Sequence, residues 1–245
     1  MVPISHEQLA TLEHWFTPDR PGPLVGLHVI RTGNGTCLVD RWPEPRALLV
    51  ETAANYSVAG DPEALAPADL RGRLRGFVEA PPPFVPLLRA AFPRLLVWDR
   101  VVLALDGPLR PAPAPRQLVR RLGAGDAAAL AALSEGSSWV SRTWGGPAGL
   151  ASSGTAWGAF SLDRLVSVAG VFFVGDHYEE IGVATEPGFR GRGLSSACAG
   201  AVCADILRRG HTPSWTTSQD NAASVRVAHK LGFALRRHDH LYVIS

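Results

Sequence analysis

A basic, glycine-rich turn between a predicted strand and a predicted helix is the part of the sequence best suited to bind an anion. The strand is a β-branched and apolar run from Ile181 to Thr185, and the helix starts at Leu194 and continues to about Arg209. Gly191 and Gly193 lack a Cβ, so the turn can present successive backbone N–H groups beside the unpaired donors of the helix start. The turn also holds two permanent positive charges, Arg190 and Arg192. Such a site suits a ligand that carries a pyrophosphate.

The spacing Arg190-x-x-Gly193-x-Ser195 resembles the acyl-CoA signature of the GNAT superfamily of N-acyltransferases, which reads Arg/Gln-x-x-Gly-x-Gly/Ala. Ser195 departs from the last position, but it is small, so we expect the pyrophosphate loop to be kept. Taken alone, this turn also fits an ordinary strand-to-helix connection with solvated arginines. A second segment about 30 residues later resembles the closing helix of the same superfamily, with an Asn-x-x-Ser start and a Lys-Leu-Gly-Phe end, at Asp220 to Phe233. Two motifs in the expected order favour the GNAT interpretation.

The resemblance implies an α/β (α+β) fold: a C-terminal GNAT domain with a mixed, mostly antiparallel central sheet flanked by helices, after a smaller α+β N-terminal domain. It implies acetyl-CoA as co-substrate and no metal. In the family, the strand before the turn binds the pantetheine arm through its backbone, and the turn and the following helix start bind the pyrophosphate. The cofactor-binding residues so implied are Val183, Ala184, Thr185, Arg190, Gly191, Arg192, Gly193, Leu194, Ser195, Asn221 and Ser224.

The resemblance also implies a carboxylate that acts on the amine from the start of the cofactor strand, where this chain has Glu179 and Glu180. Because side chains alternate along a strand, we expect one of the two to face the cleft. The other interpretation is a pair of solvated acids. Many family members carry a tyrosine that protonates the leaving thiolate, and Ala228 stands at that position here. His229, Ser224 and water are the candidate substitutes.

The function implied is transfer of an acetyl group from acetyl-CoA directly to a primary amine, most simply that of a small molecule. The alternative is a non-catalytic CoA-binding sensor or partner module, which would explain Ala228. A small-molecule kinase is disfavoured, because the turn lacks the Gly-Lys-Ser/Thr ending of a P-loop. Four further segments resemble a two-part bacterial branch similar to the zwittermicin-resistance enzyme: Trp144-Gly-Gly146, Glu180 to Thr185, Pro213-Ser-Trp215, and Asn221 to Phe233.

Composition sets the remaining expectations. The chain has 245 residues, a formal net charge of +2 and no basic stripe, which argues against nucleic acid or an anionic membrane as partner. The three cysteines show no metal spacing and fit packed thiols in a reducing compartment. We find no signal-peptide pattern and no 18-residue apolar span, so the sequence predicts a cytoplasmic protein, monomeric or homodimeric.

A proline-rich stretch divides the chain into two predicted domains. We expect an N-terminal α+β domain at residues 1–110, a linker at 111–116 and the GNAT domain at 117–245; the branch resemblance implies that the first is a degenerate, GNAT-like partner domain. Helices are expected at 6–16, 64–77, 84–92, 127–133 and 194–209, and a last helix is expected from a cap at Asp220 or Asn221 to its end at Gly232. Strands are expected at 26–30 and 36–40 around a hairpin turn, and at 47–51, 95–98, 101–105, 117–122, 155–162, 165–174, 181–185 and 214–217, with a closing hairpin at 233–237 and 241–244. Asp205 and Arg209 are expected to pair on the solvent side of their helix.

Overall fold

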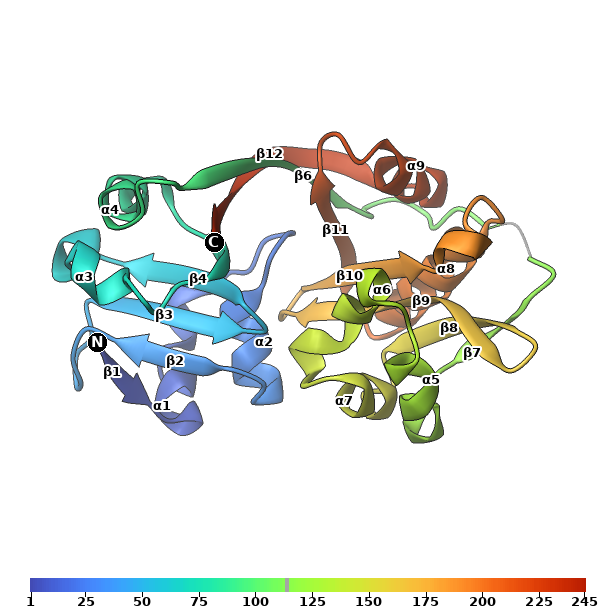
Figure 1. Ribbon diagram of the computed structural model, residues 1–245, viewed down its shortest axis with the longest axis horizontal. Helices are drawn as coiled ribbons and strands as arrows, with labels where there is room; N and C mark the ends of the chain where they lie inside the picture. Colours follow the sequence, from blue (N-terminus) through green and yellow to red (C-terminus); the bar gives the residue numbers. More distant parts are fainter. Residues whose placement is uncertain (113–114) are drawn as a thin grey trace. The chain divides into compact units, whose positions relative to one another are not determined.

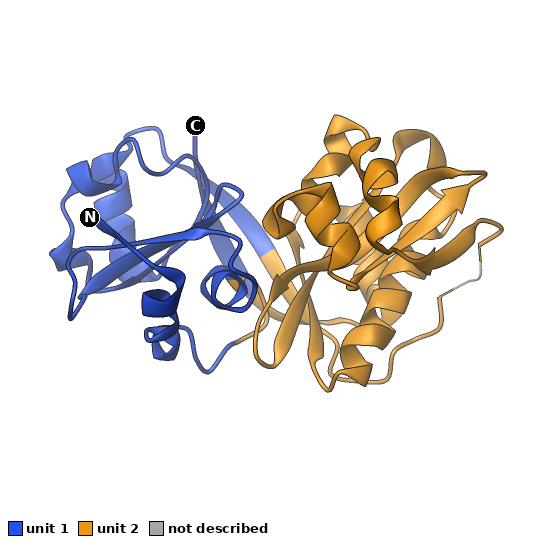
Figure 2. Ribbon diagram, turned by 90° about the horizontal axis from the view of Figure 1, so that it is seen from below, with its two compact units in different colours: residues 1–19, 25–100, 238–245 blue, residues 20–24, 101–237 orange. Residues whose placement is uncertain are grey.

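The computed structural model describes residues 1–112 and 115–245, which form two compact units (Figure 2). The first unit comprises residues 1–19, 25–100 and 238–245, and the second comprises residues 20–24 and 101–237. These bounds differ from the predicted domains, because the C-terminal residues 238–245 complete the sheet of the first unit. The predicted linker 111–116 includes residues 113–114, which lie outside the described residues.

The first unit holds strands in the order β1-β2-β3-β4-β5-β12 (Figure 1). Neighbouring strands are antiparallel except β4 and β5, which are parallel. Its core is formed by apolar residues of β3, β4 and α4 together with Phe84, which is 1% exposed. The elements are β1 (Val2–Ile4), α1 (His6–Ala10), α2 (Val25–Thr32), β2 (Thr36–Val39), β3 (Ala47–Thr52), β4 (Asn55–Gly60), α3 (Pro67–Leu70), β5 (Gly76–Glu79), α4 (Val85–Ala91), part of β6 (Leu96–Ala104) and part of β12 (Ala234–Ile244).

Three sequence-based assignments in this part of the chain are wrong. The strand and hairpin turn expected at 26–35 are helix α2 and its end; every residue from Val25 to Ile30 is buried, so the apolar pattern has no period that separates helix from strand. The helix expected at 64–77 is reduced to α3, because Arg71 is extended and the chain then enters β5. The strands expected at 95–98 and 101–105 are one strand, β6.

The second unit holds strands in the order β7-β8-β9-β10-β11-β6 (Figure 1). The β7–β8, β8–β9 and β9–β10 pairs are antiparallel, whereas β10 and β11 are parallel. The elements are β7 (Leu118–Arg121), α5 (Ala127–Ala131), α6 (Glu135–Ser138), the 3₁₀ helix η5 (Trp139–Trp144), α7 (Pro147–Ser152), β8 (Ala156–Ser161), β9 (Arg164–Val174), β10 (Tyr178–Thr185), α8 (Leu194–Arg208), β11 (Thr212–Ser218) and α9 (Ala222–Leu231), with the remaining parts of β6 and β12.

Helix α8 is the main partner of this sheet. Leu194, Cys198 and Val202 are each at most 1% exposed and share one core cluster with Ile181 of β10 and Val171 of β9. Cys198 and Cys203 are each 0% exposed, which confirms the expectation of packed thiols, and this burial raises the pKa of each to about 12.

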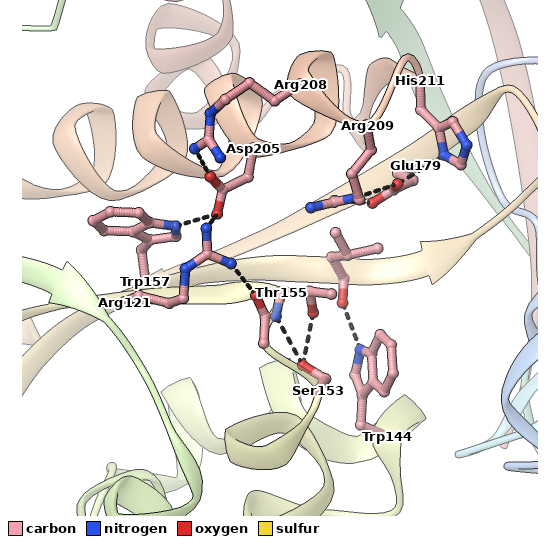
Figure 3. Close-up of polar contacts among 12 residues, drawn as sticks. Arg121, Trp144, Ser153, Thr155, Trp157, Glu179, Asp205, Arg208, Arg209 and His211 are labelled. Carbon is pink, nitrogen blue, oxygen red and sulfur yellow. Dashed lines mark hydrogen bonds and ion pairs between the residues drawn. The ribbon is translucent and has the colours of Figure 1, made fainter.

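Two further expectations in this unit are wrong. Asp205 is 2% exposed rather than solvated, and its carboxylate accepts hydrogen bonds from Trp157 Nε1 at 2.7 Å and from Arg208 (Figure 3). It also pairs with Arg121 at 2.5 Å, whereas Arg209 pairs elsewhere. The closing hairpin is instead one continuous strand, β12.

Candidate functional site

The parallel strands β10 and β11 pair over a short length and then diverge. Their described pairing covers three rows, which join Tyr178–Glu180 to Thr212–Ser214, although β10 continues to Thr185 and β11 to Ser218. A cavity of about 600 Å³ lies at the diverging ends. Backbone N–H and C=O groups of a strand need partners, so a strand edge that faces a cavity can bind an extended ligand. The residues lining the cavity are Gly136, Ser137, Trp139, Ile181, Val183, Ala184, Thr185, Arg190, Gly191, Gly193, Ser195, Ser196, Trp215, Thr216, Thr217, Asn221, Ala223, Ser224, Arg226, Val227 and Lys230.

The glycine-rich turn forms one end of this cavity. Gly191 and Gly193 have φ values of 76° and 78°, a left-handed conformation that a side chain would strain, and a Cβ at either position would meet no atom within 4 Å. Gly193 directly precedes α8, whose 15 residues give it a full helix dipole. Arg190 also lines the cavity, and its Nε donates to the Thr185 carbonyl at 3.3 Å. This end therefore combines open space, N–H donors and positive charge.

Hydroxyl contacts tie the strand end to the helix start. Thr185 Oγ1 lies 2.9 Å from Ser195 Oγ and 2.6 Å from Ser167 Oγ. The small serine at the last position of the signature thus bonds to β10 and still lines the cavity. Asn221 Oδ1 accepts from the Ser224 N–H at 3.1 Å and caps α9, while Ser224 Oγ accepts from Trp215 Nε1 at 2.9 Å.

Two of the residues predicted to bind the cofactor do not line the cavity. Arg192 donates to the Gly188 carbonyl at 3.0 Å, and its guanidinium carbon lies 4.9 Å from the centroid of the Phe189 ring. Leu194 is 1% exposed and belongs to the core under α8. The other nine predicted residues all line the cavity.

The two glutamates at the start of β10 lie on opposite faces of the strand. Glu179 is 2% exposed; its carboxylate accepts from Arg209 at 2.6 and 3.1 Å and lies 2.8 Å from His211 Nδ1 (Figure 3). Glu180 is 6% exposed and neither residue lines the cavity. Glu179 pairs with Arg209 at the end of α8 and therefore faces that helix. Because side chains alternate along a strand, Glu180 lies on the face of β10 opposite α8.

Of the two side chains considered as the thiol acid, Ser224 lines the cavity and His229 does not. His229 is exposed, its carbonyl accepts from Arg110 at 3.4 Å, and its side chain does not line the cavity. Ala228 is buried in the core with 0% exposure. The helix face that does reach the cavity carries Ala223, Arg226, Val227 and Lys230, an i, i+3, i+4, i+7 series. Sequence reasoning missed Arg226 and Lys230, although this spacing from the Asn-x-x-Ser start could have identified them.

The buried carboxylate of Glu186 lies between the end of β10 and the glycine-rich turn. Glu186 is 3% exposed and accepts from Ser134 Oγ at 2.8 Å, from the Ser134 N–H at 3.2 Å and from Arg164 at 3.1 Å. Burial raises its pKa, but the hydrogen bonds from Ser134 and Ser137 and the charge of Arg164 outweigh burial, so the pKa lies below the ordinary value for Glu. Glu186 therefore connects the end of β10 to α6, whose Ser137 lines the cavity.

The charges and hydroxyls around the cavity are unevenly distributed. Among the described lining residues, the charged side chains are Arg190, Arg226 and Lys230, and none is acidic. Thr216 Oγ1 is buried and has no hydrogen-bond partner among the described residues. The described part of the chain contains no cluster of three metal-ligating residues, and none of its helices is long and apolar enough to cross a membrane.

Known proteins that resemble this chain are GNAT-type N-acetyltransferases, in agreement with the sequence motifs. The GNAT acetyltransferase family model matches residues 125–242. An "Uncharacterized N-acetyltransferase in mutA 5′ region" from Streptomyces virginiae is 42% identical over 214 residues, which cover 86% of this chain and 90% of that protein. A GCN5-related N-acetyltransferase-like protein from Streptococcus suis shares the fold with a TM-score of 0.74 at 18% identity, covering 97% of this chain and 98% of that one. A tandem GNAT protein from the clavulanic acid biosynthesis pathway gives a TM-score of 0.62 at 15% identity, covering 98% and 96%.

The similarity to the Streptomyces protein extends over both units of the chain, and the two solved structures match it almost from end to end. The mixed, mostly antiparallel sheets flanked by helices confirm the predicted fold. The chain therefore belongs to the GNAT acetyltransferase family.

Proposed function

We propose that the protein transfers an acetyl group from acetyl-CoA directly to a primary amine of a small molecule. The observation that supports this most strongly is the divergence of β10 and β11 into a cavity that ends at the glycine-rich turn and the start of α8. An extended chain with a pyrophosphate fits both features, because the strand edge offers backbone partners and the helix start offers donors and a positive dipole. The Thr216 hydroxyl, buried without a described partner, adds a polar group for such a ligand.

The residues of this site have separate roles in the proposal. The backbone of Val183 to Thr185 binds the pantetheine arm, and the turn from Arg190 to Gly193 with Ser195 binds the pyrophosphate. Arg226 and Lys230 add positive charge from α9. Arg192 and Leu194, which lie off the cavity, support the turn rather than contact the cofactor.

In the transfer step, the neutral amine nitrogen attacks the thioester carbonyl, the new C–N bond forms and the C–S bond breaks. The amine gives up one proton and the departing thiolate takes one. We assign the first role to Glu180, directly or through one water, because alternation places it on the face of β10 opposite α8, whereas Glu179 faces α8 and pairs with Arg209 and His211. A thiol has an ordinary pKa of about 8.5, so water can protonate the thiolate near neutral pH without a side-chain acid at Ala228.

Calorimetric titration with CoA, compared with pantetheine, which lacks the phosphates, tests the cofactor assignment. We expect CoA to bind and pantetheine to bind at least tenfold more weakly, because the charged hydrogen bonds at the turn are lost. Equal binding of the two, or binding of neither, would contradict the assignment.

The second candidate function is a non-catalytic CoA-binding module. It is favoured by one observation: neither of the two glutamates nor His229 lines the cavity, and Ala228 is buried where the family acid is expected. Release of thiol from acetyl-CoA on addition of a broad amine panel distinguishes the two. Tight CoA binding with no amine-dependent thiol release would favour the module.

A further inference from the structure

A β-bulge in β9 lies next to Trp139, a residue that lines the cavity. Glu180 pairs with Phe173 and Ile181 pairs with Val171, so Phe172 is the extra residue of β9. A bulge re-aims its side chain and frees carbonyls from the ladder. Here the Phe172 carbonyl accepts from Thr143 Oγ1 at 2.7 Å, and the Val171 carbonyl accepts from Trp144 Nε1 at 2.6 Å. The bulge therefore fixes the end of η5 against the sheet.

This anchoring positions Trp139, the first residue of η5. Its ring packs edge-on against Phe172, with centroids 5.4 Å apart at an interplanar angle of 71°. Both side chains lie over Gly182 of β10: a Cβ there would lie 3.2 Å from Trp139 Cζ3 and 3.3 Å from Phe172 Cβ. Such distances are tighter than ordinary contacts, so the close approach of the two aromatic side chains depends on glycine at this position. Trp139 is half-buried and lines the cavity.

The faces of β10 show what else lies near this aromatic surface. Glu179 bonds to Arg209 beyond the end of α8, and Ile181 packs in the α8 core, so these two residues face α8. Gly182 faces Trp139 and Phe172, and alternation places Glu180 on that same face, two residues away along the strand. The lining residues contributed by α6 and η5 are uncharged: Gly136, Ser137 and Trp139. The cationic lining residues instead lie on the turn and on α9.

Resting on the proposed function, we infer that the acceptor is a primary amine borne on a flat, apolar group, in the simplest case an aromatic ring. The ring packs on Trp139 over Gly182, and the amine lies toward Glu180. A half-buried indole offers a rigid apolar surface with a preferred edge or offset geometry, which a flat aromatic ring matches more fully than a polyamine or an amino sugar does. The carboxylate on the same face attracts the ammonium form of the amine before it loses its proton.

The test compares amines of similar basicity with acetyl-CoA and the full-length protein, by CoA release. We expect kcat/KM for 2-phenylethylamine and tryptamine to exceed that for butylamine by about 10- to 100-fold, since the ring removes additional apolar surface from water. Spermidine and glucosamine are expected to be poorer still. Faster turnover of spermidine or glucosamine than of the ring amines would overturn the inference.

Variants at Trp139 and Gly182 test whether this aromatic surface causes the preference for ring amines. Trp139→Ala should raise KM for tryptamine at least tenfold with little change for butylamine, whereas Trp139→Phe should retain most of the preference. Gly182→Ala should reduce the preference by displacing the indole. Trp42→Ala, at a 39% exposed tryptophan of the first unit, is the matched control and should change neither value. An unchanged ratio of tryptamine to butylamine in Trp139→Ala, with intact folding by circular dichroism, would also overturn the inference.

Direct binding keeps the inference separate from the proposed function. If CoA binds but no amine is turned over, titration of tryptamine into the CoA-loaded protein, followed by calorimetry, still tests the aromatic surface. Saturable binding that Trp139→Ala weakens supports it, and absence of binding at millimolar tryptamine contradicts it. Failure of CoA itself to bind would instead contradict the proposed function.

Discussion

The two units repeat one strand order but differ at the place where the second has its cavity. In each, three antiparallel pairs lead to a parallel pair, β4–β5 in the first unit and β10–β11 in the second. Each parallel pair has three described rows. In the second unit both strands continue beyond these rows, whereas in the first β5 ends at Glu79 and the next turn places Phe84 in the core beside Val58 and Val78.

The segments that follow the equivalent strands differ as well. After β10 comes Arg190 to Gly193 and the 15-residue helix α8, whereas after β4 comes Asp61-Pro-Glu63 and the four-residue helix α3. A short helix preceded by two acids does not attract a phosphate. Similar topology therefore does not make a similar site; the diverging strands, the left-handed glycines and the long helix are needed together. This contrast supports the proposal that the first unit is a degenerate partner of the second.

The largest expected effect comes from Glu180→Ser, which gives β10 the residue that β4 has at the equivalent position. Glu180 pairs with Ser214 in the third row of β10–β11, and Ser57 pairs with Glu79 in the third row of β4–β5. Glu180→Ser should lower kcat by about 10²- to 10⁴-fold at neutral pH, with partial rescue at high pH where the amine deprotonates unaided. CoA affinity should not change. The pH profile of kcat is the measurement.

Glu179→Gln is the control for this change, because Glu179 is paired with Arg209 and His211. It should lower thermal stability rather than kcat. An equal loss of kcat in both variants would reverse the assignment, and two harmless variants would leave catalysis to the positioning of the amine and thioester alone.

The next effect concerns the left-handed glycines. Gly193→Asp should weaken CoA binding roughly 100-fold, because a carboxylate beside a pyrophosphate costs several kcal/mol. Gly72→Asp in the first unit is the matched control: Gly72 has φ 75°, and a Cβ there also meets no atom within 4 Å. Both variants should lose a similar amount of stability, about 1 to 2 kcal/mol from backbone strain. Calorimetry shows whether only Gly193→Asp loses CoA; equal affinity in the two variants would contradict an anion site at the turn.

The two arginines of the turn are expected to differ in how much they contribute to CoA affinity, and this effect is smaller. Arg190→Ala should weaken CoA binding about tenfold, the value of one charge-assisted hydrogen bond. Arg192→Ala should weaken it less than threefold, because Arg192 bonds to Gly188 and stacks on Phe189 outside the cavity. A larger loss for Arg192→Ala would restore the sequence-based interpretation, in which both arginines contact the cofactor.

Local patterns explain what could be predicted from the sequence. The strand, turn and helix of β10–α8 are specified by neighbouring residues, so their existence and the start of α8 at Leu194 are confirmed within this segment. The end of α9 at Gly232 follows in the same way, and its cap is Asn221, one of the two candidates that the sequence offers with Asp220. That these residues bind CoA stays a prediction.

Features that depend on packing between distant segments could not be predicted. The divergence of β10 and β11 and the place of Trp139 over Gly182 depend on strand register and on a bulge. The solvated pair expected at Asp205 and Arg209 follows helix spacing, yet Arg121 and Trp157 from other strands bury Asp205. The strand β12 pairs with β5, which lies more than 150 residues earlier in the sequence, so local patterns do not show that β12 is one continuous strand.

The smallest expected effect compares an ion pair in each unit as the pH falls. Arg120 donates to Asp126 at 2.6 and 2.8 Å; these bonds outweigh burial and lower the pKa of Asp126 to about 2. Because the folded pKa lies below the unfolded value of about 3.9, the pair stabilises the fold above about pH 4 and loses that contribution toward pH 2.

Asp126→Asn should cost about 1 kcal/mol at pH 7, since Arg120 is 42% exposed and solvent screens the pair, and the difference from wild type should vanish as the pH approaches 2. The pair Arg46–Asp61 of the first unit is more exposed at its carboxylate, 37% against 14%, so Asp61→Asn should cost less. Thermal melts between pH 2 and 7 give both differences, and a constant difference for Asp126→Asn across that range would show that the side chain stabilises the turn by its shape and not its charge.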